Sequence, residues 1–327
     1  MHTITNFCIN ESFNHFSFPS HASHVSSQSP SPFEPAFYHQ AKGVPEWEQA
    51  MKNELDALNA NNTWDIVKLP KGKKPISCRW VYKVKLKADG LVERFKARLV
   101  AKGFTQKEEI EFHETYSPVV KFTTVRSLVA LAVKNHWDIH QFDVNNAFLH
   151  GKLHEEVYMR LPPGHENTSQ SLVCKLKKSL YGLKQASRQW YSKLSEALHQ
   201  QGYKHSPNDH SLFLKNNGSS LVIVAIYVDD ILVTGNNTED IFKLKAFLHD
   251  KFQIKDLGFL NFFLGIEFKK VKDGMVAHQT KFIKELLQTY NVHDTTSVTT
   301  PLPYQDRFVL FGTVFEPIQQ NTLTTSS

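Results

Sequence analysis

Two adjacent aspartates, Asp229 and Asp230, stand between two apolar runs, and no other feature constrains the fold of this chain as strongly. Leu221–Val228 precedes the pair and Ile231–Val233 follows it. Short apolar runs of this length are typical of buried strands. Two such strands predict a hairpin whose turn holds the acidic pair at the edge of an apolar core. Unpaired charge at such a place is costly unless a cation neutralises it. The pair therefore indicates a metal site, with a solvated hairpin turn as the alternative.

A second acidic residue, Asp143, follows another predicted strand and has apolar neighbours in the stretch 141–149. Mg²⁺ takes few protein carboxylates and keeps positions for water and phosphate. Carboxylates from separate segments, such as Asp143 and Asp229, suit this cation and indicate phosphoryl transfer. Successive residues of an extended segment face opposite ways, so Asp230 and Asp229 need not reach the same ion.

Composition indicates the kind of partner and the kind of compartment that suit this protein. The net charge of +6 and the pI near 9.0 indicate a polyanionic partner. The three cysteines, Cys8, Cys78 and Cys174, are far apart and show no zinc-binding spacing, which favours a reduced, intracellular setting. No apolar stretch is as long as a membrane span, so we expect a soluble protein with no membrane partner.

The chain before the acidic pair contains three predicted regions. Residues 1–32 are rich in Ser, His, Asn and Pro and are expected to be disordered. A helix is predicted behind Pro45, with an apolar stripe formed by Trp47, Met51, Leu55 and Leu58. From Arg79 a period of two predicts a strand with Trp80, Tyr82, Val84 and Leu86 on one face, and Asp89-Gly90 predicts a hairpin to a second strand.

This predicted ribbon is strongly basic on one face. Between residues 71 and 102 the sequence has eleven basic residues, against Asp89 and Glu93 as the only acidic ones: Lys71, Lys73, Lys74, Arg79, Lys83, Lys85, Lys87, Arg94, Lys96, Arg98 and Lys102. Such an imbalance favours a phosphate-facing surface. An ordinary solvated sheet face is the alternative.

The second half of the chain alternates strand and helix patterns. Strands are expected within Asp209–Gly235, a helix over Asp240–Phe252, and strand-like structure over Phe252–Phe268 with a bend at Leu257-Gly258. A last amphipathic helix is predicted around Lys281–Tyr290. Residues 304–327 lack periodicity and are expected to be an unstructured tail.

The ordered motifs resemble the reverse transcriptase of copia-like retrotransposons. The matching stretches are Trp47–Leu58, Arg79–Phe104, Glu114–Val125, Gln141–Gly151, Ser179–Trp190, Tyr227–Gly235 and Phe263–Glu267, and the resemblance covers residues 33–303. It implies an α+β right-hand polymerase core. Fingers and palm would extend to about residue 268, and a short or incomplete thumb would occupy 269–303.

The resemblance also implies RNA-directed DNA polymerisation assisted by two Mg²⁺ ions, for which Mn²⁺ can substitute. Catalysis is assigned to Asp143, Asp229 and Asp230, and metal binding to these residues and Val144. The implied nucleotide contacts are Lys96, Arg98, Phe148, Tyr181, Gly182 and Lys184, and the implied primer and template contacts are Lys83, Lys85, Tyr227, Phe263 and Gly265. The implied partners are a primed RNA or DNA template and deoxynucleoside triphosphates, and the implied location is the cytoplasm, retrotransposon particles or the nucleus. Phe148 would exclude a ribose 2′-hydroxyl, with a core position as the alternative.

The sequence departs from the family at two places. Glu109 and Glu111 stand where the family commonly has Gly and Asp, and extra negative charge there is expected to weaken template contact. RNase H, integrase and protease segments are not recognised in the sequence, so a decayed or repurposed nucleic-acid-binding fragment is the rival hypothesis. A metal-dependent nuclease also uses paired carboxylates, but it explains neither Phe148 nor the basic ribbon.

Overall fold

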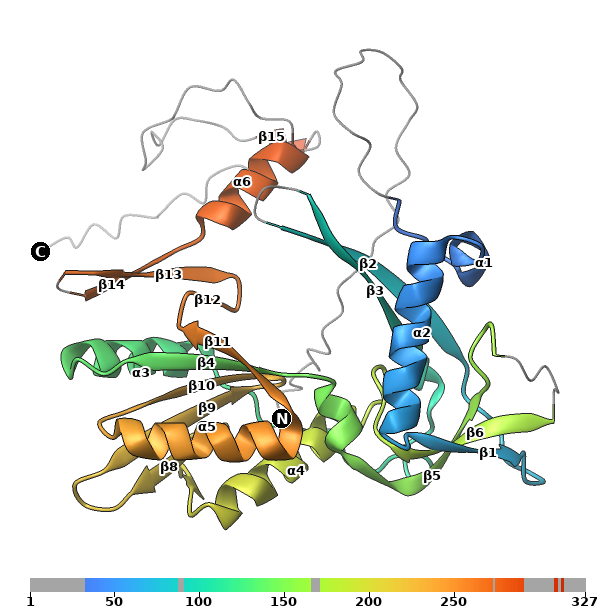
Figure 1. The fold of residues 1–327 in the computed structure, drawn as a ribbon, viewed down its shortest axis with the longest axis horizontal. Coiled ribbons are helices and arrows are strands. Elements are labelled where there is room, and N and C mark those ends of the chain that lie inside the picture. The colour runs from blue at the N-terminus through green and yellow to red at the C-terminus, as the bar shows by residue number, and fades with distance from the viewer. Residues whose placement is uncertain are drawn as a thin grey trace, which may run out of the picture. The chain divides into compact units, whose positions relative to one another are not determined.

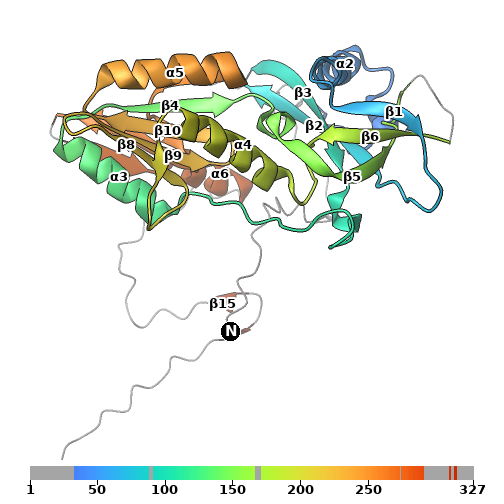
Figure 2. The ribbon, with the colours of Figure 1, turned by 90° about the horizontal axis from the view of Figure 1, so that it is seen from below.

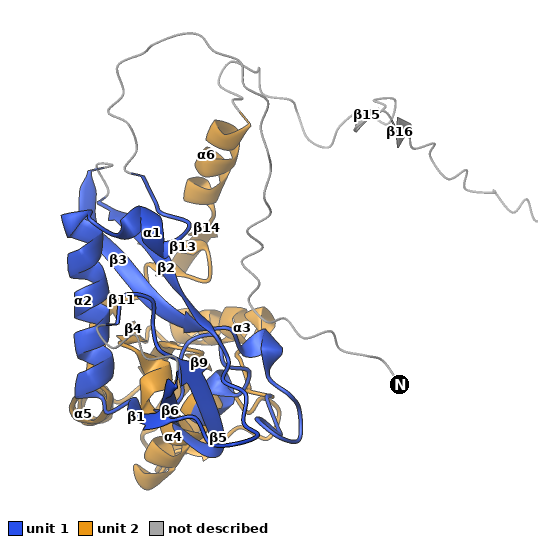
Figure 3. Cartoon of the chain, turned by 90° about the vertical axis from the view of Figure 1, so that its right-hand side faces the viewer, with its two compact units in different colours: residues 1–115, 151–189 blue, residues 116–150, 190–327 orange. Residues whose placement is uncertain are grey.

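The computed structural model describes residues 33–87, 91–165, 171–272 and 274–290, together with the backbone of 309–310 and 313–314. The chain divides into two compact units, which Figure 3 colours separately. Unit 1 comprises residues 1–115 and 151–189, and unit 2 comprises residues 116–150 and 190–327. The predictions for residues 1–32 and for the Asp89-Gly90 turn lie outside the described residues.

Unit 2 is built on a six-stranded antiparallel sheet with strand order β11-β4-β10-β9-β8-β7. Its strands are β4 (Ile139–Val144), β7 (Lys204–His205), β8 (Leu212–Asn216), β9 (Leu221–Tyr227), β10 (Asp230–Gly235) and β11 (Ile254–Phe259). The strands predicted on both sides of the acidic pair are confirmed as β9 and β10. The bend predicted at Leu257-Gly258 is a β-bulge, because the register of β11 shifts between Asp256 and Gly258.

Helices cover both faces of this sheet (Figures 1 and 2). The helix α3 (Phe122–Lys134) lies on one face, and α5 (Thr238–Phe252) lies on the other, where α4 (Ala186–Gln200) shares its core. Phe142 and Ile231 belong to the α4 and α5 core, whereas Leu232 belongs to the α3 core. The strand β9 is a nearly continuous apolar run because its alternate residues enter these two different cores.

A smaller antiparallel sheet follows in unit 2, with strand order β12-β13-β14, and leads into the last described helix (Figure 1). Its elements are β12 (Phe262–Phe263), β13 (Ile266–Val271), β14 (Gly274–His278) and α6 (Thr280–Thr289). The helix predicted over 281–290 is confirmed, although its apolar side chains are exposed. Within the predicted unstructured tail, β15 (Val309–Leu310) pairs with β16 (Thr313–Val314), and the rest of the tail lies outside the described residues.

Unit 1 contains the predicted ribbon, formed by β2 (Cys78–Leu86) and β3 (Val92–Ala101), and the predicted helix α2 (Pro45–Ala60). Trp47 of α2 packs edge-on against Tyr82 and Phe95, with ring centroids 5.3 and 4.7 Å apart. The predicted alternation in β2 is confirmed except at Leu86, which is exposed at the end of the strand, where the ribbon register shifts between Lys85 and Leu86. In α2, Leu55 is only partly buried, and Glu54 beside it is buried.

The remainder of unit 1 is a three-stranded antiparallel sheet of order β1-β6-β5 and short helical turns. Its strands are β1 (Trp64–Lys68), β5 (Lys152–Arg160) and β6 (Leu172–Lys178), and the short turns are α1 (Tyr38–Ala41) and η1 (Gly103–Thr105), while η2 (Ala147–His150) belongs to unit 2. In the described part of the chain, no helix is long and apolar enough to cross a membrane.

Candidate active site

The acidic pair stands at the tight turn between β9 and β10. Tyr227 and Asp230 are register partners, so Val228 and Asp229 form a two-residue connection. Val228 has φ 54° and Asp229 does not have a positive φ, which is the pattern of a type II′ hairpin turn. A glycine usually occupies the first position of such a turn, and a β-branched residue there is strained by roughly 1–3 kcal/mol.

Asp143 and Asp230 are direct cross-strand partners, because β4 and β10 are antiparallel neighbours. Side chains opposite each other in such a pair share a face and have Cβ atoms about 4.5–5.5 Å apart. Asp229 lies in the adjoining turn, where its carbonyl accepts a hydrogen bond of 3.0 Å from the Val144 N–H. The predicted acidic residues are therefore brought together, with Asp230 rather than Asp229 directly opposite Asp143.

The pKa of Asp230 is raised to about 6, first by burial and then by the charges of Asp229 and Asp143. A hydrogen bond from the Gln141 amide to the Asp230 carboxylate acts in the opposite direction. Gln141 is 5% exposed, and sequence reasoning missed it. Its available signal was a polar residue inside an apolar strand, two positions before Asp143 and therefore on the same face.

A divalent cation suits this group of carboxylates chemically. Desolvated like charges raise the pKa of Asp230, and a nearby cation would lower it again by favouring the charged form. Across the described residues, however, no three His, Cys, Asp or Glu side chains are gathered closely enough to hold a metal ion. The predicted role of Val144 as a metal contact is untested, and its N–H serves the Asp229 carbonyl.

Four other predicted residues lie in unit 2. Phe148, in η2, is partly buried against the α4 and α5 core, which agrees with the packing alternative and leaves the predicted sugar contact untested. Tyr227 meets Phe263 edge-on with ring centroids 6.3 Å apart. Phe263 is 2% exposed, so its ring is a core residue in this conformation and does not present a surface to nucleic acid. Gly265 has φ 78°, which favours glycine.

The basic face of the ribbon is present in unit 1, but the fold neutralises part of it. Lys83 is opposite Lys96 and Lys85 is opposite Arg94, so these side chains share a face. The expectation that Asp89 and Glu93 are the only opposing charges is wrong, because acidic residues from outside the ribbon reach it. The ion pairs are Lys83 with Glu34 at 3.2 Å, Arg98 with Glu54 at 2.6 Å and Lys73 with Glu156 at 3.1 Å.

Arg98, Tyr181 and Gly182 also come together in unit 1. The Arg98 guanidinium carbon lies 5.5 Å from the centroid of the Tyr181 ring. A Cβ atom on Gly182, which has φ 92°, would lie 2.1 Å from the Ala101 carbonyl oxygen. The close approach predicted for Gly182 therefore serves packing of the chain on its own backbone, and contact with a ligand stays a prediction.

Lys184 is held by a pair of buried glutamines that sequence reasoning missed. The Lys184 N–H donates to the Gln106 side chain at 3.0 Å, and Gln106 donates to Gln185 at 3.1 Å. Gln185 in turn donates to the Glu111 carbonyl at 3.0 Å. The Lys184 ammonium lies 4.7 Å from the Phe112 ring centroid. Glu111, predicted to weaken template contact, thus helps to fix this loop through its backbone.

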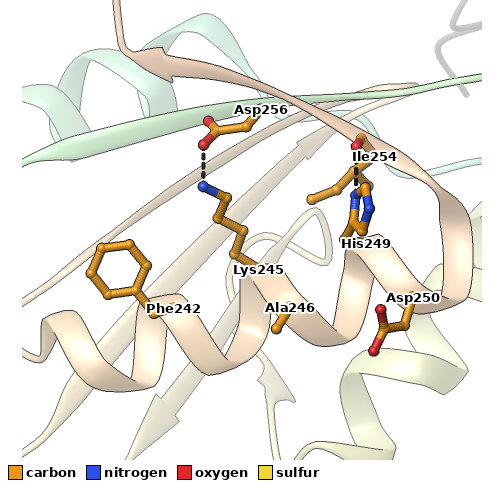
Figure 4. Close-up of a pocket in the computed structure, with 7 residues that line it drawn as sticks. All are labelled: Phe242, Lys245, Ala246, His249, Asp250, Ile254 and Asp256. Atoms are coloured by element: carbon orange, nitrogen blue, oxygen red, sulfur yellow. Dashed lines mark hydrogen bonds and ion pairs between the residues drawn. The ribbon is translucent and has the colours of Figure 1, made fainter.

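A cavity of about 510 Å³ lies between α5 and β11 in unit 2 (Figure 4). Ile254 and Asp256 line it from β11, and Lys245 from α5 is paired with Asp256. Lys255, between the two β11 residues, is the register partner of Asp143. Because successive side chains of a strand face opposite ways, the cavity and the acidic residues lie on opposite faces of the sheet.

Comparison with known proteins identifies relatives of this chain. A family model described as reverse transcriptase (RNA-dependent DNA polymerase) matches residues 61–303. The Retrovirus-related Pol polyproteins from transposons RE1 and RE2 of Arabidopsis thaliana are 42% identical over 81% of this chain and 41% identical over 85%. The corresponding protein from transposon TNT 1-94 of Nicotiana tabacum is 42% identical over 78% of this chain. These matches cover 18%, 19% and 19% of the three relatives, so the chain spans about a fifth of their length.

One solved structure is also similar, a foamy viral protease-reverse transcriptase in complex with double-stranded DNA. It has a TM-score of 0.37 and 14% sequence identity, with 87% of this chain and 42% of that chain covered. At this TM-score the likeness adds nothing to the assignment, which depends on the sequence relatives.

Proposed function

Because this chain belongs to the reverse transcriptase (RNA-dependent DNA polymerase) family, we propose that it is the RNA-directed DNA polymerase region of a copia-like retrotransposon Pol protein. The observation that carries the proposal is the cross-strand pairing of Asp143 with Asp230, with Asp229 in the adjoining turn. The rise in the Asp230 pKa supports it, because a bound cation would stabilise carboxylates that otherwise repel one another.

In this proposal Asp143, Asp229 and Asp230 would hold two Mg²⁺ or Mn²⁺ ions, and these ions would supply positive charge that lowers the pKa of the primer 3′-hydroxyl and neutralises the leaving pyrophosphate. The contribution of the chain is to hold the carboxylates in place on a rigid sheet. Bound cations would keep these carboxylates in their charged form, because a nearby positive charge disfavours protonation. Gln141 orients the Asp230 carboxylate through its hydrogen bond. Phe148 is proposed to limit the space beside the incoming sugar.

The six-stranded sheet of unit 2 is proposed as the palm, and the β2–β3 ribbon of unit 1 as the fingers. The helix α6 would begin a short thumb. The proposed nucleotide contacts of the fingers side are Lys96, Arg98, Tyr181, Gly182 and Lys184, and the proposed primer and template contacts are Lys83, Lys85, Tyr227 and Gly265. Arg98 would have to exchange Glu54 for a phosphate, since it is ion-paired in this structure.

Primer extension by the purified protein tests the proposal. Asp143→Asn and Asp229→Asn should each lower Mg²⁺-dependent extension at least about 100-fold while the melting temperature stays the same or rises, because each removes a charge that a cation balances. Asp250→Asn is the matched control, since Asp250 is an exposed carboxylate on α5 of the same unit. A chain that binds primed template but never extends it, in Mg²⁺ or Mn²⁺, is instead a decayed nucleic-acid-binding fragment.

A further inference from the structure

The turn that carries Asp229 has a backbone conformation that its own sequence disfavours. Val228 has φ 54°, where the branched side chain of a valine crowds the backbone. A residue stays in such a conformation only when the surrounding structure holds it there. The hydrogen bonds of the turn show which groups do so.

Two hydrogen bonds hold the two carbonyl groups of the turn. The indole N–H of Trp190 donates to the Val228 carbonyl at 2.7 Å. The Val144 N–H, next to Asp143, donates to the Asp229 carbonyl at 3.0 Å. The second bond is between backbone groups, so truncating a side chain leaves its donor and acceptor in place. The first bond depends on one side chain, which stands 38 positions earlier in the chain, on α4.

The indole of Trp190 is itself held rigidly. Trp190 is 1% exposed and belongs to the core between the sheet and the helices α4 and α5. Its ring meets Phe252 nearly perpendicularly, with centroids 5.1 Å apart, and His150 lies at 5.7 Å. Packing therefore fixes the direction of the N–H before any ligand binds, which is how a supporting residue pre-organises a site.

We propose that Trp190 is a positioning residue of the acidic site, because its indole N–H holds the strained Val228–Asp229 turn in place. By this restraint it sets the position from which Asp229 reaches a divalent cation. The role in cation binding rests on the proposed function, whereas the restraint of the turn is a property of the metal-free protein. The restraint of the turn and the role in cation binding can therefore be measured in separate experiments.

Trp190→Phe is the test variant, because it keeps an aromatic ring in the core and removes only the donor and part of the indole. Trp80→Phe is the matched control. Trp80 is 4% exposed, and its indole N–H donates to the Pro163 carbonyl at 3.0 Å in unit 1, so the same substitution breaks the same kind of bond elsewhere. Should Trp190→Phe fail to fold, Trp190→Tyr fills more of the space and still lacks the indole donor.

The first measurement is amide hydrogen exchange of the metal-free protein over residues 226–233. Trp190→Phe should speed exchange in this segment roughly tenfold, because the Val228 carbonyl loses its partner, while Trp80→Phe should leave it unchanged. The second measurement is Mn²⁺ binding. Trp190→Phe should weaken it by roughly 10- to 100-fold, as losses of supporting residues at metal sites do.

Steady-state extension separates positioning from a general structural defect. Trp190→Phe should lower kcat roughly 10- to 100-fold with the KM for deoxynucleotides changed less than about threefold. In a Val228→Gly background the loss should be at least about threefold smaller, because glycine adopts a positive φ without strain. Unchanged exchange, equal effects of Trp190→Phe and Trp80→Phe, or the same loss in both backgrounds would each overturn the inference. If the wild type does not extend primers, the proposed function fails. Hydrogen exchange and Mn²⁺ binding then still test the role of Trp190 as a positioning residue.

Discussion

The two units treat their charged residues in opposite ways. In unit 1, Glu34 and Glu54 reach the basic ribbon from outside it and pair with Lys83 and Arg98. In unit 2, the charges that act on the Asp230 carboxylate are those of Asp229 and Asp143, and no cation is among them. The fold thus neutralises part of its basic surface itself, whereas the Asp230 carboxylate is surrounded by charges of its own sign that raise its pKa.

This difference shows that a count of charges along the sequence is a poor guide to a phosphate-binding surface. Lys83 and Lys85 stand two positions apart on the same face of β2, and only Lys83 has an ion pair within the described part of the chain. Lys85 is therefore expected to attract a polyanion more strongly than Lys83 does. Pairing with an acidic residue distant in sequence decides which of them presents its full charge.

The largest effect is expected when the internal partner of Arg98 is removed. Glu54→Ala should lower the free energy of unfolding by about 3–5 kcal/mol, because the Glu54 side chain is 6% exposed and its loss leaves a partly buried guanidinium and the Leu99 N–H without their acceptor. Urea denaturation measures the loss. Glu239→Ala, which breaks an exposed pair with Lys243 on α5, should cost less than about 0.5 kcal/mol. If Glu54→Ala and Glu239→Ala lost the same free energy of unfolding, the buried pair of Glu54 with Arg98 would contribute no more than an exposed pair, which would contradict this prediction.

A smaller effect is expected on nucleic-acid binding. Lys85→Glu should weaken affinity for primed template roughly tenfold and reduce the salt dependence, because each phosphate contact releases counterions. Lys83→Glu should cost less, since Glu34 already offsets part of the Lys83 charge. Fluorescence anisotropy over a series of salt concentrations gives both numbers. Identical losses, or no change in slope, would make this face an ordinary solvated surface.

The smallest effect concerns Asp230 in the metal-free protein. The folded pKa of about 6 lies above the ordinary value of 3.8, so the stability associated with protonating this carboxyl is present below about pH 4 and is lost as pH rises through 6. Asp230→Asn removes this pH-dependent loss of stability, because an asparagine side chain does not ionise. We expect the variant to match the wild type near pH 4 and to be more stable by about 1 kcal/mol at pH 7.5, after allowance for solvent screening. Denaturation in EDTA at both pH values measures this, and a difference that does not grow with pH would contradict the assignment.

Local patterns predicted the elements of the fold that depend on neighbouring residues. The apolar runs beside Asp229 are β9 and β10, and the stripe containing Trp47 is the buried face of α2. Period-two patterning also found the first strand of the ribbon, and the Asp89-Gly90 hairpin signal found the second. Each of these signals lies within a single segment, where side-chain periodicity follows directly from backbone geometry.

Contacts between distant segments could not be predicted in this way. The register of Asp143 opposite Asp230, the ion pair of Glu54 with Arg98 and the hydrogen bond of Trp190 each join residues 38 or more positions apart. The sequence marked Trp190 only as the end of the stretch Ser179–Trp190 that resembles the family, because such a match says nothing of where an indole N–H points. Gly182 was predicted to approach a ligand, since the sequence does not reveal that the Ala101 backbone fills that space.

Unit 1 is assembled from two stretches of chain that are separated by part of unit 2, and this has a consequence for synthesis on the ribosome. The strand β1 pairs with β6, which follows it by about a hundred residues. At translation speeds of roughly 5–20 residues per second, β1 waits about 5–20 s for its partner. The hairpin of β2 and β3 can close within about 1–10 μs of leaving the exit tunnel. A nascent chain therefore exposes an unpaired edge strand for seconds, and this interval is when it is most open to aggregation or to capture by a chaperone.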